Sequence, residues 1–445
     1  MTSSPRPRAV SRRSAAPDAA DAAAAAVVPG GWRPAGWALA ALGAATVAVV
    51  ALTTPWRALP SAAPAVAPDP ARDFTAGQIA RSEAFDAALT APAYLSLGLT
   101  LLVAGVLVAT PLGARLLGRL RGPRWVRALL GVAGLSAAVE ALRWPLGMWS
   151  ETQLRAYGLS TQTWPSWTAD RLKDIGVRTA LLAIMVLAVT VLAGRFRRWW
   201  IPAAAGAFTL TVAASFAYPV VIEPIFNDFT PMAAGPLRDD LLAMAARDGV
   251  PVEDVLVADA SRRTTALNAY VSGFGATRRI VVYDTLLRAP AKEVELVVAH
   301  ELGHAKAGDV LYGTLVGGLG AAFGACLLYL VLAAGPVRRR AGVASAADPR
   351  AVGLIMGLLS LATVLSGPAQ NLVSRQIEAR ADAHALELTR DPETFAAMQR
   401  RLSVTNVSDL SPDFLEYVLY GSHPTTPQRI AMARSWARLN GVPEP

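Results

Sequence analysis

The segment 297–304 contains the residues best suited to chemistry, in the pattern His-Glu-x-x-His formed by His300, Glu301 and His304. Residues four apart lie on one face of a helix, so the two imidazoles could hold one cation together. Glu301 follows the first of them and could reach a water molecule at that cation, as a general base does. A chance match on a surface helix is the alternative, but the chain has only 4 histidines. We therefore predict one Zn²⁺ per chain.

A third ligand is expected, because catalytic zinc takes three protein ligands and keeps one position open. The segment 374–384 contains three candidates, Glu378, Asp382 and His384. Glu378 is the best candidate, and Asp382, one turn later, could hydrogen-bond a ligand imidazole and set its tautomer. His384 is the rival ligand, although it lies six residues from Glu378 and faces another direction. The alternative is a solvated helix in which Glu and Arg form mixed pairs.

The last histidine, His423, follows Gly421 in a short loop. An isolated loop histidine is usually only a polar surface residue. Because the other three histidines gather at one predicted site, we expect His423 to be a catalytic partner there. Arg429, six residues later, is expected to stabilise the same site.

Residues 266–271 precede a glycine-containing turn and a second strand-like segment, 279–284. This pattern predicts a hairpin close in sequence to the histidine motif. An exposed strand edge could hold an extended peptide by backbone pairing. An ordinary hairpin without that role explains the pattern equally well.

The composition predicts a membrane protein that positions these residues. Of 445 residues, 53% are hydrophobic and 17% are charged, and the mean hydropathy is +0.37, which excludes an ordinary soluble protein. The net charge of +9 does not indicate nucleic acid, because the arginines cluster in short loops between apolar runs. Apolar runs predict seven membrane spans, at about 36–56, 95–118, 125–149, 175–194, 201–226, 308–334 and 351–373.

We expect a mostly α-helical, multi-pass membrane protein with a small α+β zincin-like metalloprotease domain. That domain should contain a helix at 237–248 and strands at 252–259 and 279–284. The chain then divides into five parts: a disordered basic tail (1–35), five membrane helices with a loop at 57–93 (36–226), the α+β domain with the His-Glu-x-x-His helix (227–307), helices six and seven (308–373), and a helical segment that completes the zinc site (374–445).

Charged residues inside the predicted spans require an explanation. Glu140 and Arg143 lie three residues apart on one face of the third span, either as a self-compensating ion pair or as the wall of a polar cavity. Pro219 and Pro224 are expected to break the fifth span near its end, with Glu223 between them.

The arginine clusters predict the topology. They lie at 6–13, 115–127, 195–198 and 338–350, which seven spans would bring to one side, the cytoplasmic side by the positive-inside rule. The predicted site would then face the extracytoplasmic side, in the cell membrane. If the histidine helix continued into the sixth span, the metal would lie roughly 9 Å from the apolar region.

Taken together, these motifs resemble the integral-membrane CAAX prenyl protease 1 family, zinc metallopeptidases of the gluzincin type that process prenylated C-termini. Four blocks between about 75 and 435 carry the resemblance: residues 74–81; residues 218–231; residues 268–287; and the His-Glu-Leu-Gly-His motif with the later Glu378, Asp382 and His423. The family often has two prolines after the late histidine, where this chain has Pro424 and Thr425.

The resemblance implies seven helices that enclose a chamber, with zinc at its cap. It implies that His300, His304 and Glu378 are the ligands and that Glu301 is the base. It also implies that Asp382 supports a ligand, that His423 donates to the transition state, and that the segment Asn268, Ala269 and Tyr270 contacts substrate backbone.

The predicted function is a membrane-embedded zinc metalloendopeptidase that acts on a peptide or protein substrate, lipidated or otherwise associated with the bilayer. One alternative is a quality-control endopeptidase that cuts misfolded membrane proteins. The other is a non-catalytic scaffold or transporter with a structural zinc. Structural zinc is usually closed by four side chains and needs no glutamate beside the first histidine, which favours the enzyme.

Overall fold

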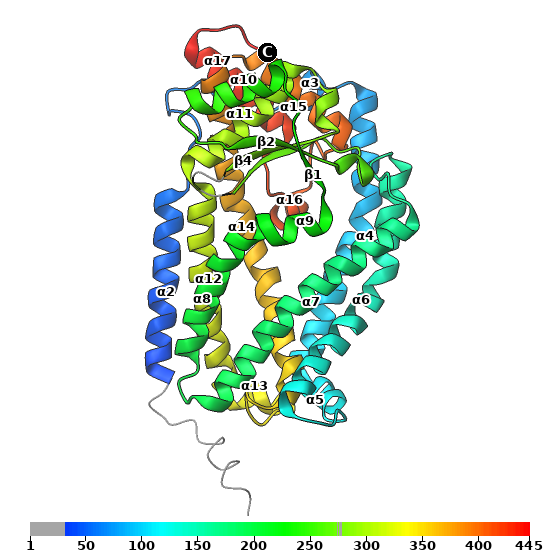
Figure 1. Cartoon of the computed structure of the whole chain (residues 1–445), viewed down its shortest axis with the longest axis vertical. Coiled ribbons are helices and arrows are strands. Elements are labelled where there is room, and N and C mark those ends of the chain that lie inside the picture. The colour runs from blue at the N-terminus through cyan, green and yellow to red at the C-terminus, as the bar shows by residue number, and fades with distance from the viewer. Residues whose placement is uncertain (1–31, 274, 276–277) are drawn as a thin grey trace, which may run out of the picture.

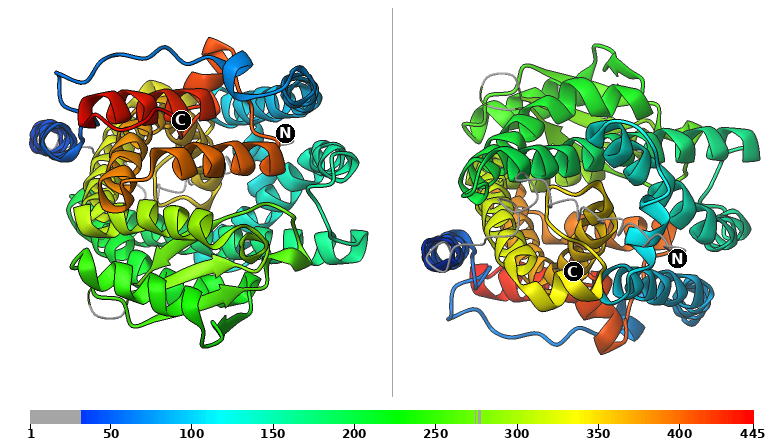
Figure 2. Two further views of the ribbon diagram at one scale, coloured as in Figure 1. Left: turned by 90° about the horizontal axis from the view of Figure 1, so that it is seen from above. Right: turned by 90° about the horizontal axis from the view of Figure 1, so that it is seen from below.

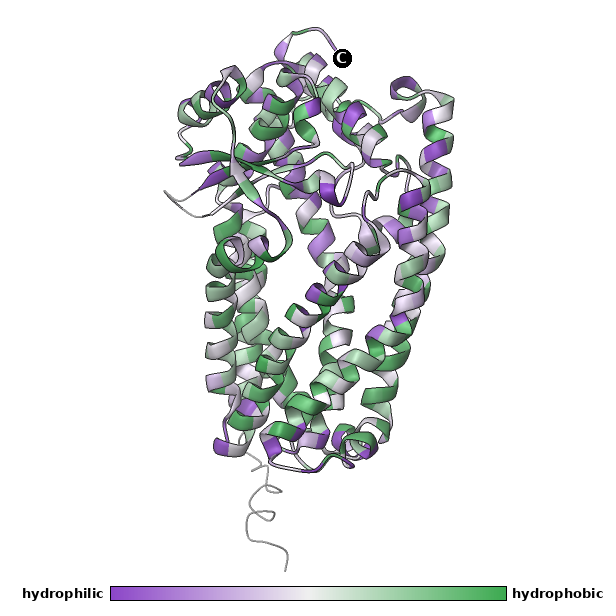
Figure 3. Cartoon of the chain, turned by 45° about the vertical axis from the view of Figure 1, so that its right-hand side comes forward, coloured by the Kyte–Doolittle hydropathy of each residue, from purple (hydrophilic) through white to green (hydrophobic). Residues whose placement is uncertain are grey.

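A bundle of long helices carries a cap of shorter helices and one small sheet in the computed structural model, which describes residues 32–273, 275 and 278–445 (Figure 1). Hydrophobic residues cover the bundle, whereas hydrophilic residues are concentrated in the cap and at the opposite end (Figure 3). Most of the predicted basic tail, residues 1–31, lies outside the described residues. Residues 32–35, which the prediction assigned to this tail, already belong to helix α2.

Seven helices of the described chain are long and apolar enough to cross a membrane, as predicted. They are α2 (Trp32–Thr53), α4 (Ala76–Ala109), α6 (Arg124–Ala156), α7 (Trp164–Arg195), the segment Trp200–Phe226, α12 (Asp309–Ala333), and the segment Pro349–Thr389, which contains α14 (Val352–Thr389). Two short helices, α5 (Leu112–Leu117) and α13 (Gly335–Arg340), lie at the end of the bundle opposite the cap (Figure 1).

The predicted loop at 57–93 is wrong over much of its length. Helix α3 (Pro70–Asp73) lies within it, and α4 begins at Ala76 rather than near 95. Thr75 and Gln78 form a capping box that starts α4 in this polar stretch. The added turns pack against the cap, where Ser82 Oγ donates to Ser408 O at 2.8 Å.

Proline interrupts the fifth span as predicted. Helix α8 (Trp200–Ala217) passes into a π-helical turn, η1 (Tyr218–Ile222), and then into α9 (Glu223–Phe226). Pro219 and Pro224 have no backbone N–H to donate, so the regular α-helical pattern cannot continue through them. The chain bends there and passes beneath the sheet (Figure 1).

Glu140 forms the predicted ion pair with Arg143 and also pairs with an arginine of the neighbouring helix α7. Its carboxylate lies 3.2 Å from Arg171 Nη2 on α7, and 3.9 Å from Arg143 Nη1. Arg143 donates to Ser96 Oγ on α4 at 3.2 Å. These contacts link α4, α6 and α7, which are candidate membrane helices, and an unpartnered charge within such a helix would be costly.

The cap contains a four-stranded sheet in the order β1-β2-β4-β3. Strands β2 (Asp254–Ala258) and β4 (Arg279–Tyr283) pair in parallel, and β3 (Ala269–Ser272) pairs antiparallel with β4. The predicted hairpin and both predicted strands are therefore confirmed. Strand β1 (Phe229–Pro231) pairs antiparallel with β2 and was not predicted, because it is only three residues long.

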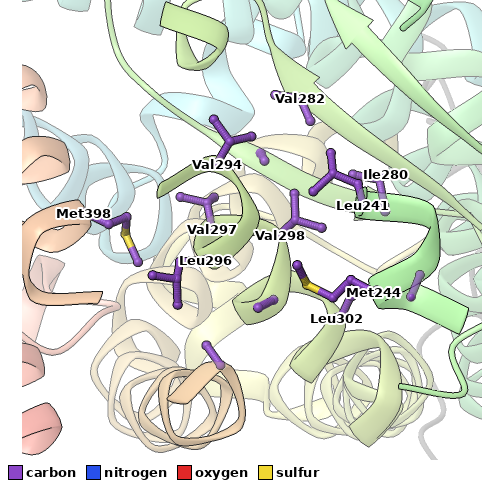
Figure 4. Close-up of a cluster of buried hydrophobic side chains, with 14 of the residues drawn as sticks. Leu241, Met244, Ile280, Val282, Val294, Leu296, Val297, Val298, Leu302 and Met398 are labelled. Carbon is purple, nitrogen blue, oxygen red and sulfur yellow. The ribbon is translucent and has the colours of Figure 1, made fainter. Parts of the chain in front are cut away.

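Helix α11 (Ala291–Ala307) carries the histidine motif through the core of the cap (Figure 4). Val294, Val298 and Leu302 follow a four-residue period and are fully buried against Leu241 and Ile280. Burial of each such side chain contributes about 1.5–3 kcal/mol. This packing holds the opposite face of α11, with its histidines, in one orientation.

Helix α11 does not continue into the sixth span. Gly308, with φ of 73°, ends α11 in the left-handed conformation that glycine adopts most easily, and α12 begins at Asp309. The estimated distance between metal and apolar region, which assumed a continuous helix, therefore does not apply.

The remaining cap helices pack against α11, against α14 or against one another (Figure 2). They are α10 (Pro236–Arg247), which confirms the predicted helix, α15 (Pro392–Asn406), α16 (Phe414–Tyr420) and α17 (Thr426–Asn440). Helix α14 runs without a break from the predicted seventh span into the segment that contains Glu378. The membrane bundle therefore delivers that side chain to the cap directly.

Candidate metal centre and active site

Three predicted ligands converge at the junction of α11 and α14. The Nε2 atoms of His300 and His304 lie 3.1 Å apart. Glu378 places one carboxylate oxygen 3.1 Å from His300 Nε2 and the other 3.6 Å from His304 Nε2. These three side chains form a group with the chemistry and proximity to hold a metal ion.

The other nitrogen of each imidazole faces a carboxylate. His300 Nδ1 lies 2.8 Å from Asp382 Oδ1, and His304 Nδ1 lies 2.8 Å from Asp309 Oδ2. An ionised carboxylate can only accept, so each Nδ1 carries a proton, and in a neutral imidazole the Nε2 then presents a lone pair. With both rings neutral, two lone pairs and the Glu378 carboxylate face one another, an arrangement that repels unless a proton or a metal ion lies between them. The donor set fits a metal ion.

Asp309 is the supporting residue that sequence reasoning missed. It follows Gly308, so the sequence places it on the next helix and beyond the periodicity of α11. The left-handed turn at Gly308 directs its carboxylate back to His304. Arg380 of α14 also pairs with Asp309, which holds the carboxylate from a second side. An acidic residue directly after a helix-ending glycine was the available signal.

Asp382 is fixed in the same way by Arg429. Its side chain is completely buried, and Arg429 on α17 donates to both of its oxygens, with Nε 2.7 Å from Oδ2. The fork-like guanidinium matches a carboxylate in this two-bond geometry. The prediction placed Arg429 near the site, and the structure shows that it contacts Asp382 there.

Glu301 and His423 lie in the wall of one cavity of about 470 Å³, and Glu378 and Asn268 line the same cavity. Burial raises the pKa of Glu301 above its ordinary value, while the adjacent histidines act in the opposite direction. His423 Nε2 lies 3.4 Å from Glu378 Oε2, and its side chain remains 57% exposed at the rim. The candidate base and the candidate donor therefore face the same space as the metal group.

His384, the rival ligand, lies behind α11. Its Nε2 is 2.9 Å from Asp248 Oδ2, and its ring packs against Gly303. It does not belong to the group formed by the two motif histidines and Glu378.

The three residues predicted to contact substrate do not all face the cavity. Asn268 lines the cavity, whereas Ala269 is buried and the ring of Tyr270 packs against Tyr283. Asn268 Oδ1 accepts from the N–H of Ala269 at 3.0 Å, which orients this side chain. Only the first of the three residues therefore presents its side chain to the cavity.

Seven candidate membrane helices and a His-Glu-x-x-His helix with a facing glutamate define a class of protein, the membrane metallopeptidases. Two family models match the chain: peptidase family M48 over residues 231–437, and the CAAX prenyl protease N-terminal domain with five membrane helices over residues 87–228. Together these two matches confirm the predicted resemblance to CAAX prenyl protease 1, and they show that residues 231–437 form a domain of the peptidase family M48 type.

Curated relatives include an uncharacterized metalloprotease, YhfN, of Bacillus subtilis, 32% identical over 286 residues, which are 62% of this chain and 66% of that protein. A CAAX prenyl protease 1 homolog of Oryza sativa is 33% identical over 233 residues, 50% of this chain and 53% of that protein. The chain thus matches less than two thirds of the length of either relative.

The crystal structure of S. mikatae Ste24p superimposes with a TM-score of 0.73 at 21% identity, over 92% of this chain and 100% of that one. This similarity shows a common fold. It confirms the predicted fold class, a mostly helical protein with seven candidate membrane helices and a small sheet.

Proposed function

We propose that the protein is a zinc metalloendopeptidase of the CAAX prenyl protease 1-like type. The observation that carries this proposal is the convergence of His300, His304 and Glu378 in one group, with Glu301 beside His300 and Glu378 in the cavity wall. Two histidines and one glutamate form a donor set typical of catalytic zinc. When bound, zinc would polarise the scissile carbonyl and make a water molecule more acidic.

Glu301 acts as the general base in this proposal. It accepts a proton from the attacking water as the new C–O bond forms, and gives that proton to the amine as the C–N bond breaks. The raised pKa of Glu301 supports both transfers, because a base is most effective when its pKa approaches the working pH.

His423 donates a hydrogen bond to the oxygen that gains negative charge in the transition state. Its position at the cavity rim, close to Glu378, supports this role. Loss of one such donor typically lowers the rate by roughly 100- to 1000-fold. Arg429 contributes through Asp382, which fixes the tautomer and orientation of His300.

The substrate backbone is proposed to lie along β3, next to Asn268. The carbonyl of Asn268 accepts from the N–H of Tyr283, so the alternation of a strand points the backbone groups of Ala269 and Val271 away from β4. The N–H of Ala269 is already bonded to Asn268 Oδ1, so the carbonyl of Ala269 and the backbone groups of Val271 form the edge on which an extended peptide can add. Tyr270 would then support this edge through its packing on Tyr283.

We propose a membrane-associated peptide or protein as substrate, and a prenylated C-terminus is one case to test. Helix α5, which begins the arginine cluster 115–127 with Arg115, and α13, which contains three arginines, lie at the end of the bundle opposite the cap (Figure 1). By the positive-inside rule that end is cytoplasmic, so the site would face the extracytoplasmic side of the cell membrane. Cysteine accessibility labelling on both sides of intact cells tests this orientation.

The deciding experiment compares wild type with Glu301→Gln in detergent. Zinc content is measured for both, and each is incubated with a casein-type protein and with a farnesylated peptide. We expect both to bind about one zinc and only wild type to cleave. Undiminished cleavage by the variant would contradict the assigned base. Zinc binding without cleavage of either substrate by wild type would favour a structural-zinc scaffold.

A further inference from the structure

Helix α16 is held in the cap by side chains of α14. Asn371 Nδ2 donates to the carbonyls of Val418 and Leu419, at 3.2 and 2.8 Å. Arg375 Nη1 donates to the carbonyl of Tyr417 at 3.0 Å and to that of Gly421. Three of these carbonyls lie in the last turn of α16, and that of Gly421 lies directly after it. The last carbonyls of a helix lack intrahelical partners, although that of Tyr417 also accepts from the N–H of Gly421 at 3.1 Å.

We call the hydrogen bonds that Asn371 and Arg375 donate to α16 and Gly421 the clamp. This clamp compensates for the weak packing of α16. None of its seven residues is buried, and its first residue has no side-chain cap. Phe414 is 83% exposed and Leu415 is 56% exposed. Burial of apolar surface therefore contributes little to the position of this helix, and the hydrogen bonds from α14 have a correspondingly larger share.

The clamp and the metal centre share one face of α14. Asn371, Arg375, Glu378 and Asp382 follow a spacing of four, three and four residues, which aligns them along one side of a helix. The same rigid face thus holds α16 at one end and the metal group at the other. His423 follows α16 after two residues, and its Nε2 lies 3.4 Å from Glu378.

The link between α16 and His423 is tight. The guanidinium of Arg375 lies 4.4 Å from the centre of the Tyr417 ring. A Cβ atom on Gly421 would lie 2.4 Å from Cδ2 of that ring, so a side chain at this position would displace the loop. A shift of α16 would therefore be transmitted to His423 over a very short path.

We propose that Arg375 and Asn371 are positioning residues that set the location of His423 relative to the metal centre. This inference rests on the proposed function, because it uses the role of His423 as donor to the transition state. Neither side chain contacts the metal group, so their loss should misplace His423 and leave metal binding intact. A misplacement of about 1 Å can lower a rate by about 100-fold.

The test compares Arg375→Ala, Arg375→Lys, His423→Ala and the double variant Arg375→Ala/His423→Ala in detergent. Gln376→Ala is the matched control, since it changes the neighbouring position on a different face of α14. We expect Arg375→Ala to keep its zinc, to lose about 100-fold in kcat without a rise in KM, and to cause no further loss when His423 is absent. A lysine keeps the positive charge but can donate to only some of the carbonyls that Arg375 contacts, so Arg375→Lys should recover part of the rate.

Hydrogen–deuterium exchange gives a readout that needs no activity. Exchange of residues 414–423 should increase in Arg375→Ala and in Asn371→Ala, and remain unchanged in Gln376→Ala. Unchanged exchange, wild-type kcat, loss of zinc, or multiplying effects in the double variant would overturn the proposal. If His423→Ala itself cleaves at the wild-type rate, the proposed role of His423 fails. The exchange data then still test, independently of activity, whether Arg375 and Asn371 hold residues 414–423 in place.

Discussion

The carboxylate of Asp309 lies 2.8 Å from Nδ1 of His304, although the two residues belong to different helices. The left-handed turn at Gly308 makes this contact, because it lets α12 start directly beneath the last turn of α11. One metal-site imidazole is thus oriented from the membrane helix α12, and the other is oriented from α14 through Asp382.

Asp309→Asn should weaken zinc binding by about 10- to 100-fold, because the amide no longer fixes the His304 tautomer as a carboxylate does. Competition with a chelator measures the affinity. Asp239→Asn, an exposed change on α10, is the control and should leave the affinity unchanged. Equal affinities for all three proteins would show that Asp309 has no influence on the metal.

Glu378→Ala should abolish stoichiometric zinc binding, whereas His384→Ala should retain it. The reason is geometric, since Glu378 faces both Nε2 atoms and His384 faces Asp248 behind α11. Metal analysis of the two purified variants checks this expectation. Full zinc retention in Glu378→Ala would exclude it as a ligand.

Gly303→Ala should destabilise the protein by about 1–3 kcal/mol, as overpacking does. A Cβ atom there would lie 3.1 Å from Cβ of His384 and 3.2 Å from Cα of Ala381, so α11 and α14 would have to separate. Gly313→Ala adds the same methyl group to α12 where nothing lies within 4 Å, and should be neutral or stabilising. Thermal unfolding in detergent compares them, and similar midpoints would contradict the close approach.

Glu416 should make stability depend on pH. Glu416 is partly buried, and this partial burial, together with Asp86 and Asp409, raises its pKa from 4.5 to about 7. The folded state then binds more protons than the unfolded state between these values, so the contribution is complete below pH 4.5 and is lost as pH rises through about 7. Glu416→Gln should flatten this part of the stability profile.

Thermal unfolding of wild type, Glu416→Gln and the exposed control Glu253→Gln at several pH values within that window provides the measurement. The control should keep the wild-type slope. Parallel profiles for all three proteins would show that Glu416 titrates normally.

Most of the fold class could be predicted, because it depends on local properties of the sequence. Apolar runs long enough to cross a bilayer identified the seven helices, and strand-like segments around a glycine-containing turn identified the hairpin of β3 and β4. Boundaries were less predictable. The capping box at Thr75 and Gln78 extended α4 into a polar stretch that hydropathy assigned to a loop.

The metal group was also predictable in part, since the spacing of His300 and His304 on one helix face follows from helix geometry alone. The convergence of Glu378, which lies 78 residues from His300, depends on how α14 packs against α11. The roles of the individual site residues stay predictions, which the variants described above test.

The sequence by itself determined which segments are apolar, which residues share a helix face, and which side chains can bind a metal, because spacing and side-chain chemistry are local properties. Only the tertiary structure decided which carboxylate meets which imidazole, how Gly308 redirects Asp309, and how α14 holds the loop that carries His423. Those contacts join residues far apart in the chain, and their geometry results from the packing of whole helices, which no local pattern encodes.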